Sequence, residues 1–215
     1  MISKLHYLTQ EIPGKTHLQA VKEACEAGCT WIQLRVKDKP YEEFLDLAYA
    51  SRKICSKFNA RLIINDNVQV CLQVQADGVH LGKKDMNLAC ARKVLGHDYI
   101  IGGTACSFHD VSHLHDSGAD YIGLGPFRFT NTKENLAPIL GITGYQDIVR
   151  KCRQENIEVP LIAIGGITSD DIPDLMKTGI YGIAMSNYLT INENKKEAVQ
   201  DMMTSLNGEK LELMI

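Results

Sequence analysis

The sequence lacks the features of membrane, secreted and nucleic-acid-binding proteins. No apolar run among its 215 residues approaches the roughly 18 that span a bilayer, and residues 1–6 lack the apolar core of a signal peptide. The net charge of −3 provides no basic surface for a nucleic acid or an anionic membrane. We therefore expect a cytoplasmic protein with small-molecule substrates and no nucleic-acid or membrane partner. A homo-oligomer is compatible with this composition.

The cysteine spacings that mark disulfide frameworks or zinc ribbons are also missing. The seven cysteines are odd in number, and no two of them form a C-x-x-C pair. Without an export signal, we expect them to be reduced, mostly buried thiols. No linker or low-complexity segment interrupts the chain. We expect one domain over residues 1–215, in which 208–215 forms a docked or disordered tail.

Short apolar runs alternate with longer amphipathic segments along the whole chain. The apolar runs predict eight buried strands, at residues 5–9, 31–36, 61–65, 78–81, 99–104, 121–124, 160–164 and 182–185. The amphipathic segments predict helices at 17–27, 41–58, 88–95, 110–116, 144–156, 169–177 and 193–206, and a short helix that ends near 73.

A weak internal repeat supports this order. Residues 26–34, 116–124 and 177–185 align directly, and 74–81 is a relative one residue shorter. The three aligned copies each combine a helix end, a glycine suited to the left-handed position after the helix, and a two-residue step into a strand. Eight such units predict an α/β fold, a closed parallel (βα)8 TIM barrel; a doubly wound sheet with fewer strands is the alternative.

The segment from Tyr121 to Lys133 joins a strand to a polar loop. Gly125-Pro126 ends the strand, because proline has no N–H for the ladder and fixes its own φ. Thr130, Thr132 and Lys133 follow, and their hydroxyl and ammonium groups can donate several hydrogen bonds to one phosphate. The alternative is a solvated polar loop.

Three polar side chains alternate at the end of the second predicted strand. Gln33, Arg35 and Lys37 lie two residues apart, so a strand places them on one face. Inside a barrel such a pair of cations is costly unless anions meet it. The alternative is an outward-facing ion pair covered by a helix.

Two carboxylates follow neighbouring strands. Asp66 comes after Asn65 at the end of the third strand, and Asp85 lies in the loop after the fourth. Few carboxylates, together with phosphate oxygens and waters, suit a magnesium ion. The alternative is helix capping, since both aspartates precede helices.

Small residues follow the last two predicted strands. Gly165-Gly166 comes after the seventh strand and Ser186 after the eighth, where barrels build phosphate sites from backbone N–H groups. Two anion sites, one with a metal, suggest that a diphosphate ester and a monophosphate meet in one pocket and that pyrophosphate leaves. No Ser/His/Asp or Cys/His arrangement predicts a covalent nucleophile.

Six motifs together resemble the thiamine phosphate synthase (thiamine-phosphate pyrophosphorylase) family. They are QLRVK at 33–37, IND at 64–66, ADGVHLGKKD at 76–85, GADYIGLGP at 118–126, TNTK at 130–133 and AIGGI at 163–167. The resemblance implies a transferase of thiamine biosynthesis. This enzyme joins 4-amino-2-methyl-5-hydroxymethylpyrimidine diphosphate to 4-methyl-5-(2-phosphoethyl)thiazole, with Mg²⁺ as cofactor, through a pyrimidine carbocation.

The resemblance also implies residue roles. Residues that would bind the pyrimidine diphosphate are Gln33, Leu34, Arg35, Val36, Lys37, Asn65, Thr104 and Lys133. Residues that would bind the thiazole phosphate are Thr130, Asn131, Thr132, Gly166, Met185 and Ser186. Asp66 and Asp85 would ligate Mg²⁺, and Lys133, Arg35 and Lys37 would act in catalysis.

The chain departs from the family pattern at several positions. Thr104 replaces the usual serine, Gly103 an aliphatic residue, Arg128-Phe129 the usual Phe-Pro, and Met185 a smaller valine-like residue. The related thiazole tautomerase is one alternative, but it resembles this chain less because it has a histidine where Pro126 stands. A non-catalytic binder of thiamine precursors is the other alternative.

Three histidines, His109, His113 and His115, fall on one predicted helix. The i,i+4 spacing of His109 and His113 could hold zinc, but no carboxylate or cysteine ligand set accompanies them. We therefore expect an exposed polar helix face.

Overall fold

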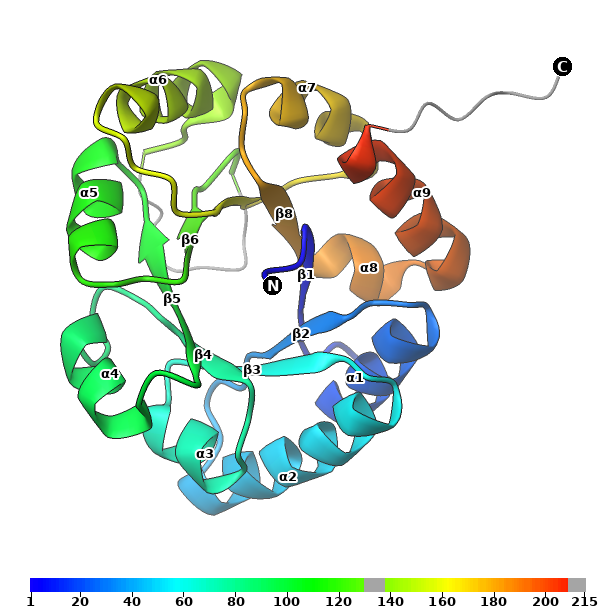
Figure 1. Cartoon of the computed structure of the whole chain (residues 1–215). Coiled ribbons are helices and arrows are strands. Elements are labelled where there is room, and N and C mark those ends of the chain that lie inside the picture. The colour runs from blue at the N-terminus through cyan, green and yellow to red at the C-terminus, as the bar shows by residue number, and fades with distance from the viewer. Residues whose placement is uncertain (130–137, 209–215) are drawn as a thin grey trace, which may run out of the picture.

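The described residues, 1–129 and 138–208 of a computed structural model, form one closed barrel. Eight parallel strands pair in chain order, and the last pairs with the first. Figure 1 shows the strands as an inner ring with the long helices around it. The predicted TIM barrel is confirmed. Residues 130–133 and most of the predicted tail lie outside the described residues.

The strands are short and fall close to their predicted positions. They are β1 (Leu5–Leu8), β2 (Trp31–Leu34), β3 (Arg61–Asn65), β4 (Gly78–Leu81), β5 (Ile100–Ala105), β6 (Tyr121–Leu124), β7 (Leu161–Ile164) and β8 (Gly182–Met185). The helices are α1 (His17–Glu26), α2 (Tyr41–Lys57), α3 (Val68–Gln73), α4 (Leu88–Leu95), α5 (Phe108–Asp116), α6 (Gly141–Gln154), α7 (Ile172–Lys177), α8 (Asn187–Ile191) and α9 (Lys195–Asn207), with a 3₁₀ turn, η1, at Ser169–Asp171. No helix among the described residues is both long and apolar enough to cross a bilayer.

The largest differences from the prediction are two shifted boundaries and one additional helix. The strand expected over 31–36 stops at Leu34, and α6 begins at Gly141 rather than near 144. The helix α8 was not predicted, because five residues are too few to show a helical period. It follows β8 directly and lies at the carboxyl end of the barrel.

The repeated helix-to-strand step has the expected backbone geometry. Gly28, Gly118 and Gly179 have φ values of 100°, 80° and 92°, in the left-handed region that glycine adopts without strain. In the shorter copy Gln75 takes this position with a φ of 50°. The step therefore depends on a left-handed residue after each of these helices.

The strand period divides each strand between two cores. Outward-facing side chains pack under the helices, whereas a smaller inner cluster contains Leu8, Trp31, Ile63, Tyr121 and Ile162. Trp31 and Tyr121 are the first residues of their strands, so this cluster fills the amino-terminal half of the barrel. The carboxyl-terminal half is lined by polar residues.

A histidine is buried within this inner cluster. The His6 ring stacks on Trp31 with 4.3 Å between centroids, and its Nε2 lies 2.9 Å from the Ser3 carbonyl oxygen. Burial lowers the pKa of His6 from 6.5 to about 3, although the Ser3 carbonyl partly opposes the shift. His6 is therefore neutral in the folded protein at any pH above this value.

We expect His6 to weaken the fold in acid. The unfolded chain protonates His6 near pH 6.5 but the folded chain only near pH 3, so its contribution is complete above pH 6.5 and is lost as pH falls toward 3. The free energy of unfolding should decrease by up to about 1.4 kcal/mol per pH unit in this window because of this residue. Urea unfolding at several pH values measures the slope.

The variant His6→Phe should show a smaller slope than the wild type, and His97→Phe, at an exposed histidine, should not change it. Equal slopes for His6→Phe and the wild type would contradict the assignment.

Candidate active site

A cavity of about 230 Å³ opens at the carboxyl end of the barrel. The polar residues that line it are Gln33, Arg35, Lys37, Asn65, Asp66, His80, Lys83, Lys84, Asp85 and Thr104, and its floor includes His6, Leu8, Tyr121, Ile162 and Ala184. Most of the polar residues come from the ends of β2 to β5 or the loops that follow. Seven predicted site residues therefore meet in one cavity.

The three alternating residues after Ile32 all border this cavity, as their spacing predicts. Gln33 is buried and donates a hydrogen bond of 2.6 Å from Nε2 to Asn65 Oδ1 on the neighbouring strand. Beyond the strand, the chain at Arg35 continues in the direction of β2, because the backbone N–H of Arg35 donates a hydrogen bond of 3.1 Å to Thr9 Oγ1. The alternative of an outward, helix-covered ion pair at Arg35 and Lys37 is wrong, since both line the cavity.

The guanidinium of Arg35 is partly buried and lies near the carboxylate of Asp66. Burial lowers its pKa, and the negative charge of Asp66 opposes this shift. A partly buried cation at the edge of a cavity favours an anionic ligand.

Asp66 turns into the cavity through an uncommon backbone conformation. Its φ is 66°, in the left-handed region, and its N–H donates to the His80 carbonyl oxygen at 2.8 Å. The cap of the next helix is Asn67, whose side chain accepts from the Val70 N–H at 2.9 Å. The helix-capping alternative is therefore wrong for Asp66.

Asp85 is held by a tight turn rather than by a helix. Its Oδ2 accepts a hydrogen bond of 2.7 Å from the Gly82 N–H, and the side chain of Asn87 caps α4. The capping alternative is wrong here too. Two carboxylates thus border one cavity beside cations, while no group of three or more His, Cys, Asp or Glu residues in 1–129 and 138–208 could hold a metal. This donor set fits magnesium bound jointly with a phosphate, since magnesium retains waters and substrate oxygens.

A chain of hydrogen bonds joins the floor of the cavity to its wall. His80 Nδ1 lies 3.0 Å from the Tyr121 hydroxyl, and Nε2 lies 2.9 Å from Thr104 Oγ1. Burial raises the pKa of Tyr121 far above its usual value, so its hydroxyl stays protonated and can donate to Nδ1. In the tautomer in which Tyr121 donates to Nδ1, His80 donates from Nε2 to Thr104.

Sequence reasoning gave His80 and Tyr121 no role. The available signal was their period: both occupy inward positions on strands adjacent to β5. Gly123 is a further signal, because a Cβ there would lie 3.1 Å from His80 Cε1. Lys83 and Lys84 were part of a motif but received no role, although both line the cavity.

The loops after β6 and β7 are joined by an ion pair. Arg128 Nη2 lies 2.5 Å from Asp171 Oδ1, and the Arg128 N–H donates to the Gly165 carbonyl oxygen at 3.0 Å. Gly166 has a φ of 66°, and a Cβ there would lie 2.5 Å from Arg128 Cγ. Arg128, which departs from the family pattern, therefore contacts the predicted phosphate loop directly.

The remaining predicted binding residues do not line the cavity. The side chains of Leu34 and Met185 are buried in the outer core, and Val36 packs against it, so only their backbone can reach a ligand. Ser186 Oγ is buried and has no hydrogen-bond partner among the described residues. Thr130, Asn131, Thr132 and Lys133 lie outside the described residues. On α5, His109, His113 and His115 are exposed, as predicted.

Comparisons with known proteins identify the family of this chain. The family model described as thiamine monophosphate synthase matches residues 5–189. A thiamine-phosphate synthase of Flavobacterium johnsoniae is 46% identical over 206 residues, which cover 96% of this chain and 97% of that protein. A thiamine-phosphate synthase of Phocaeicola vulgatus is 48% identical over 183 residues, which cover 85% of this chain and 88% of that protein.

A solved structure gives the same result. The thiamine phosphate pyrophosphorylase from Pyrococcus furiosus is 31% identical and superposes with a TM-score of 0.84, covering 96% of each chain. The family model covers the whole barrel and every cavity residue, and the two relatives match most of the chain. The chain belongs to the thiamine monophosphate synthase family.

Proposed function

We propose that this chain is a thiamine-phosphate synthase that joins 4-amino-2-methyl-5-hydroxymethylpyrimidine diphosphate to 4-methyl-5-(2-phosphoethyl)thiazole and releases pyrophosphate. The family and its relatives support the synthase activity. One observation carries the assignment of the site: Arg35, Lys37, Asp66 and Asp85 border one cavity. Two cations and two carboxylates together match a diphosphate that binds with a divalent cation.

The ends of β2 and β3 form the proposed pyrimidine diphosphate site. The hydrogen-bonded pair of Gln33 and Asn65 offers buried amide groups to the heterocycle. Arg35 and Lys37 lie farther toward the mouth and meet the phosphates. Leu34 and Val36 contribute backbone groups, and Thr104 contributes its hydroxyl beside His80.

Mg²⁺ is the proposed cofactor, and Asp66 and Asp85 are its proposed ligands. When bound, it would neutralise charge on the diphosphate as pyrophosphate leaves. Arg35, Lys37 and Lys133 would act in the same direction, because cations aimed at the leaving group stabilise its growing charge. The apolar floor around Leu8 and Ile162 would exclude water from the pyrimidine carbocation until the thiazole nitrogen attacks.

The ends of β7 and β8, with the loop after β6, form the proposed thiazole phosphate site. Thr130, Asn131 and Thr132 supply donors from the sequence, and the Gly166 and Met185 backbone supplies N–H groups. The buried hydroxyl of Ser186 supports this assignment, because it has no partner among the described residues. We also propose a cytoplasmic location, in keeping with seven free cysteines.

Pyrophosphate release by the purified protein tests the proposal. Release should require the pyrimidine diphosphate, the thiazole phosphate and Mg²⁺ together, and thiamine phosphate should form in equal amount. No release, with thiazole phosphate still bound, would indicate the tautomerase reaction or a binding protein instead. Isomerisation of the thiazole by the same sample distinguishes those two outcomes.

Asp66→Asn should lower kcat by about 100-fold or more, because a metal ligand contributes several kcal/mol to charge stabilisation. Asparagine tolerates the left-handed backbone at this position, so the fold should be retained. Steady-state kinetics across a range of Mg²⁺ concentrations gives the measurement. Asp46→Asn, at an exposed aspartate on α2, is the control; activity equal to wild type in Asp66→Asn would remove the metal assignment.

Lys133→Ala should lower kcat more than it raises KM, since the charge of the leaving group is larger in the transition state than in the bound substrate. A decrease in kcat of about 100-fold is expected. Steady-state kinetics with the pyrimidine diphosphate as the varied substrate separates the two constants. An effect on KM alone would mean that Lys133 only binds substrate.

Thr104→Val should lower kcat/KM for the pyrimidine diphosphate about tenfold, because His80 loses its hydrogen-bond partner at Nε2. Thr104→Ser keeps the hydroxyl and should stay within about twofold of wild type. Both variants are compared in the same kinetic assay. Valine keeps the threonine methyl group and serine keeps the hydroxyl, so unchanged kcat/KM in Thr104→Val, or an equal loss in Thr104→Ser, would contradict a role for the hydrogen bond alone.

A further inference from the structure

The short helix α8 depends on contacts with the rest of the protein for its stability and its position. It has five residues, and an isolated helix of this length is unstable in water. Yet it follows β8 through Ser186, so any displacement of α8 also displaces Ser186. The contacts that fix α8 therefore decide where this residue points.

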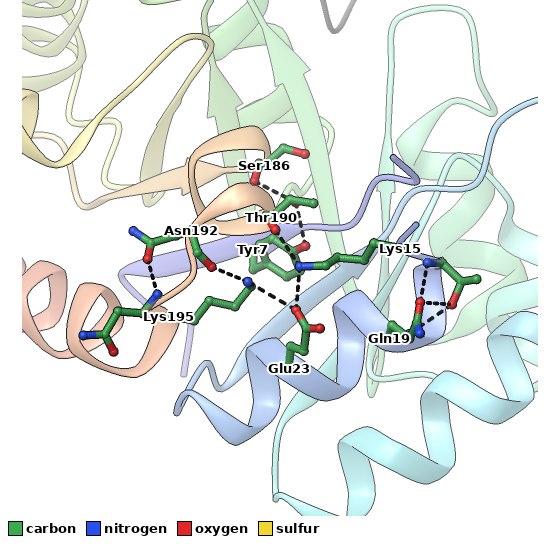
Figure 2. A network of polar contacts seen from close by, with 10 residues as sticks. Tyr7, Lys15, Gln19, Glu23, Ser186, Thr190, Asn192 and Lys195 are labelled. Atoms are coloured by element: carbon green, nitrogen blue, oxygen red, sulfur yellow. Dashed lines mark hydrogen bonds and ion pairs between the residues drawn. The ribbon is translucent and has the colours of Figure 1, made fainter. Parts of the chain in front are cut away.

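Three charged side chains meet at the carboxyl end of α8 (Figure 2). Lys15, from the loop after β1, donates from Nζ to the Thr190 carbonyl oxygen at 2.9 Å and pairs with Glu23 at 2.8 Å. Lys195, at the start of α9, pairs with the same Glu23 oxygen at 3.2 Å and donates to the Asn192 carbonyl oxygen. Both ammonium groups thus cap carbonyl groups where α8 ends, which is the favourable position for a cation.

A hydroxyl relay continues from Thr190 to Ser186. Thr190 Oγ1 lies 3.0 Å from the Ser186 carbonyl oxygen and 2.8 Å from the Tyr7 hydroxyl. A hydroxyl has one hydrogen, so when Thr190 donates to Ser186, Tyr7 donates to Thr190. Tyr7 and Thr190 are fully buried, so this relay is shielded from water. One helical turn separates the charged groups from Ser186.

Glu23 maintains the charge of both lysines. The side chains of Lys15 and Lys195 are only 19% and 13% exposed. Burial lowers the pKa of Lys195, and the nearby Lys15 ammonium lowers it further. Burial would raise the pKa of Glu23, but the two lysines outweigh burial and hold it below its usual value. Without Glu23, two partly buried cations would repel each other beside α8.

We propose that Glu23, Lys15 and Lys195 are positioning residues for the thiazole phosphate. Their ion pairs fix the carboxyl end of α8, and this holds Ser186 where it contacts the phosphate. None of the three lines the cavity, so they act through α8 and not on the substrate. The inference rests on the proposed function and assigns a role to residues outside every motif of the family resemblance.

The test compares Glu23→Gln and Lys15→Met with wild type for both substrates. KM for the thiazole phosphate should rise about tenfold in each variant, because Lys15→Met removes a charge-assisted contact to α8 and Glu23→Gln removes the charge that holds both lysines in place. KM for the pyrimidine diphosphate should stay within about twofold, since that site lies on β2 and β3. Lys15→Arg keeps the cation and donor and should restore the thiazole phosphate KM.

The control is Glu26→Gln, the same chemical change on the same helix. Among the residues that the structure describes, Glu26 pairs only with Lys22, at 3.8 Å, and both side chains are well exposed. This variant should match wild type for both substrates. A purely structural role of Glu23 would raise both KM values together or lower the melting temperature alone, and either result would overturn the inference.

If Glu23→Gln does not fold, Thr190→Val tests the same link, because it removes the hydroxyl relay to Ser186 and leaves all charges in place. It should also raise the thiazole phosphate KM selectively, and unchanged constants would overturn the inference. Wild-type turnover in this assay reports the proposed function by itself. For each substrate, the ratio of the KM of the variant to the KM of the wild type reports the role of α8.

Discussion

The ring of Tyr121 fits inside the barrel only because Gly102, on the neighbouring strand, has no side chain. A Cβ on Gly102 would lie 2.2 Å from Tyr121 Cζ. The ring completes the inner cluster with Trp31, at 5.4 Å between centroids, and the hydroxyl faces the opposite way, toward His80. One residue therefore closes the amino-terminal half of the barrel and supports the polar half. Any larger residue at position 102 would displace the Tyr121 ring and so disturb both halves of the barrel.

The inward-facing side chains fill the amino-terminal part of the barrel and leave space for the cavity at its carboxyl end. On β2 the inward positions run from Trp31 through Gln33, and Arg35 continues the series beyond the strand. On β6 they run from Tyr121 to Gly123, whose missing side chain leaves room for His80. Large rings lie at the amino ends, and small or polar residues lie at the carboxyl ends. A cavity at the carboxyl end follows from this gradient.

Sequence reasoning succeeded where a pattern is local. The period of two placed Gln33, Arg35 and Lys37 at one cavity, and the glycine of the repeat predicted the left-handed residue at Gly28. It failed where geometry depends on distant residues. Lys15 and Thr190 are 175 positions apart, so no local sequence pattern predicts their contact or the existence of α8.

Capping was ambiguous for a different reason. Asp66 and Asp85 precede helices, as capping residues do, but asparagines one or two positions later take that role. Asparagine and aspartate are nearly equal as caps, so the sequence could not choose between them. The backbone resolves the choice at Asp66, because its left-handed φ directs the carboxylate away from the helix and toward the cavity.

The cavity and the loops after β6 and β7, on the opposite side of the barrel mouth, are anchored by separate sets of contacts. The Gln33–Asn65 hydrogen bond and the turn at Asp85 belong to β2, β3 and the loop after β4. The opposite side depends on the Arg128–Asp171 ion pair and on Tyr188, whose hydroxyl donates from α8 to Ser169 Oγ at 2.9 Å. The two sets share no residue. Because distant, unshared contacts contribute to free energy almost additively, substitutions in one set should change one affinity without the other. If the barrel binds two different anions, as proposed above, this separation lets each substrate's affinity be adjusted by its own loops.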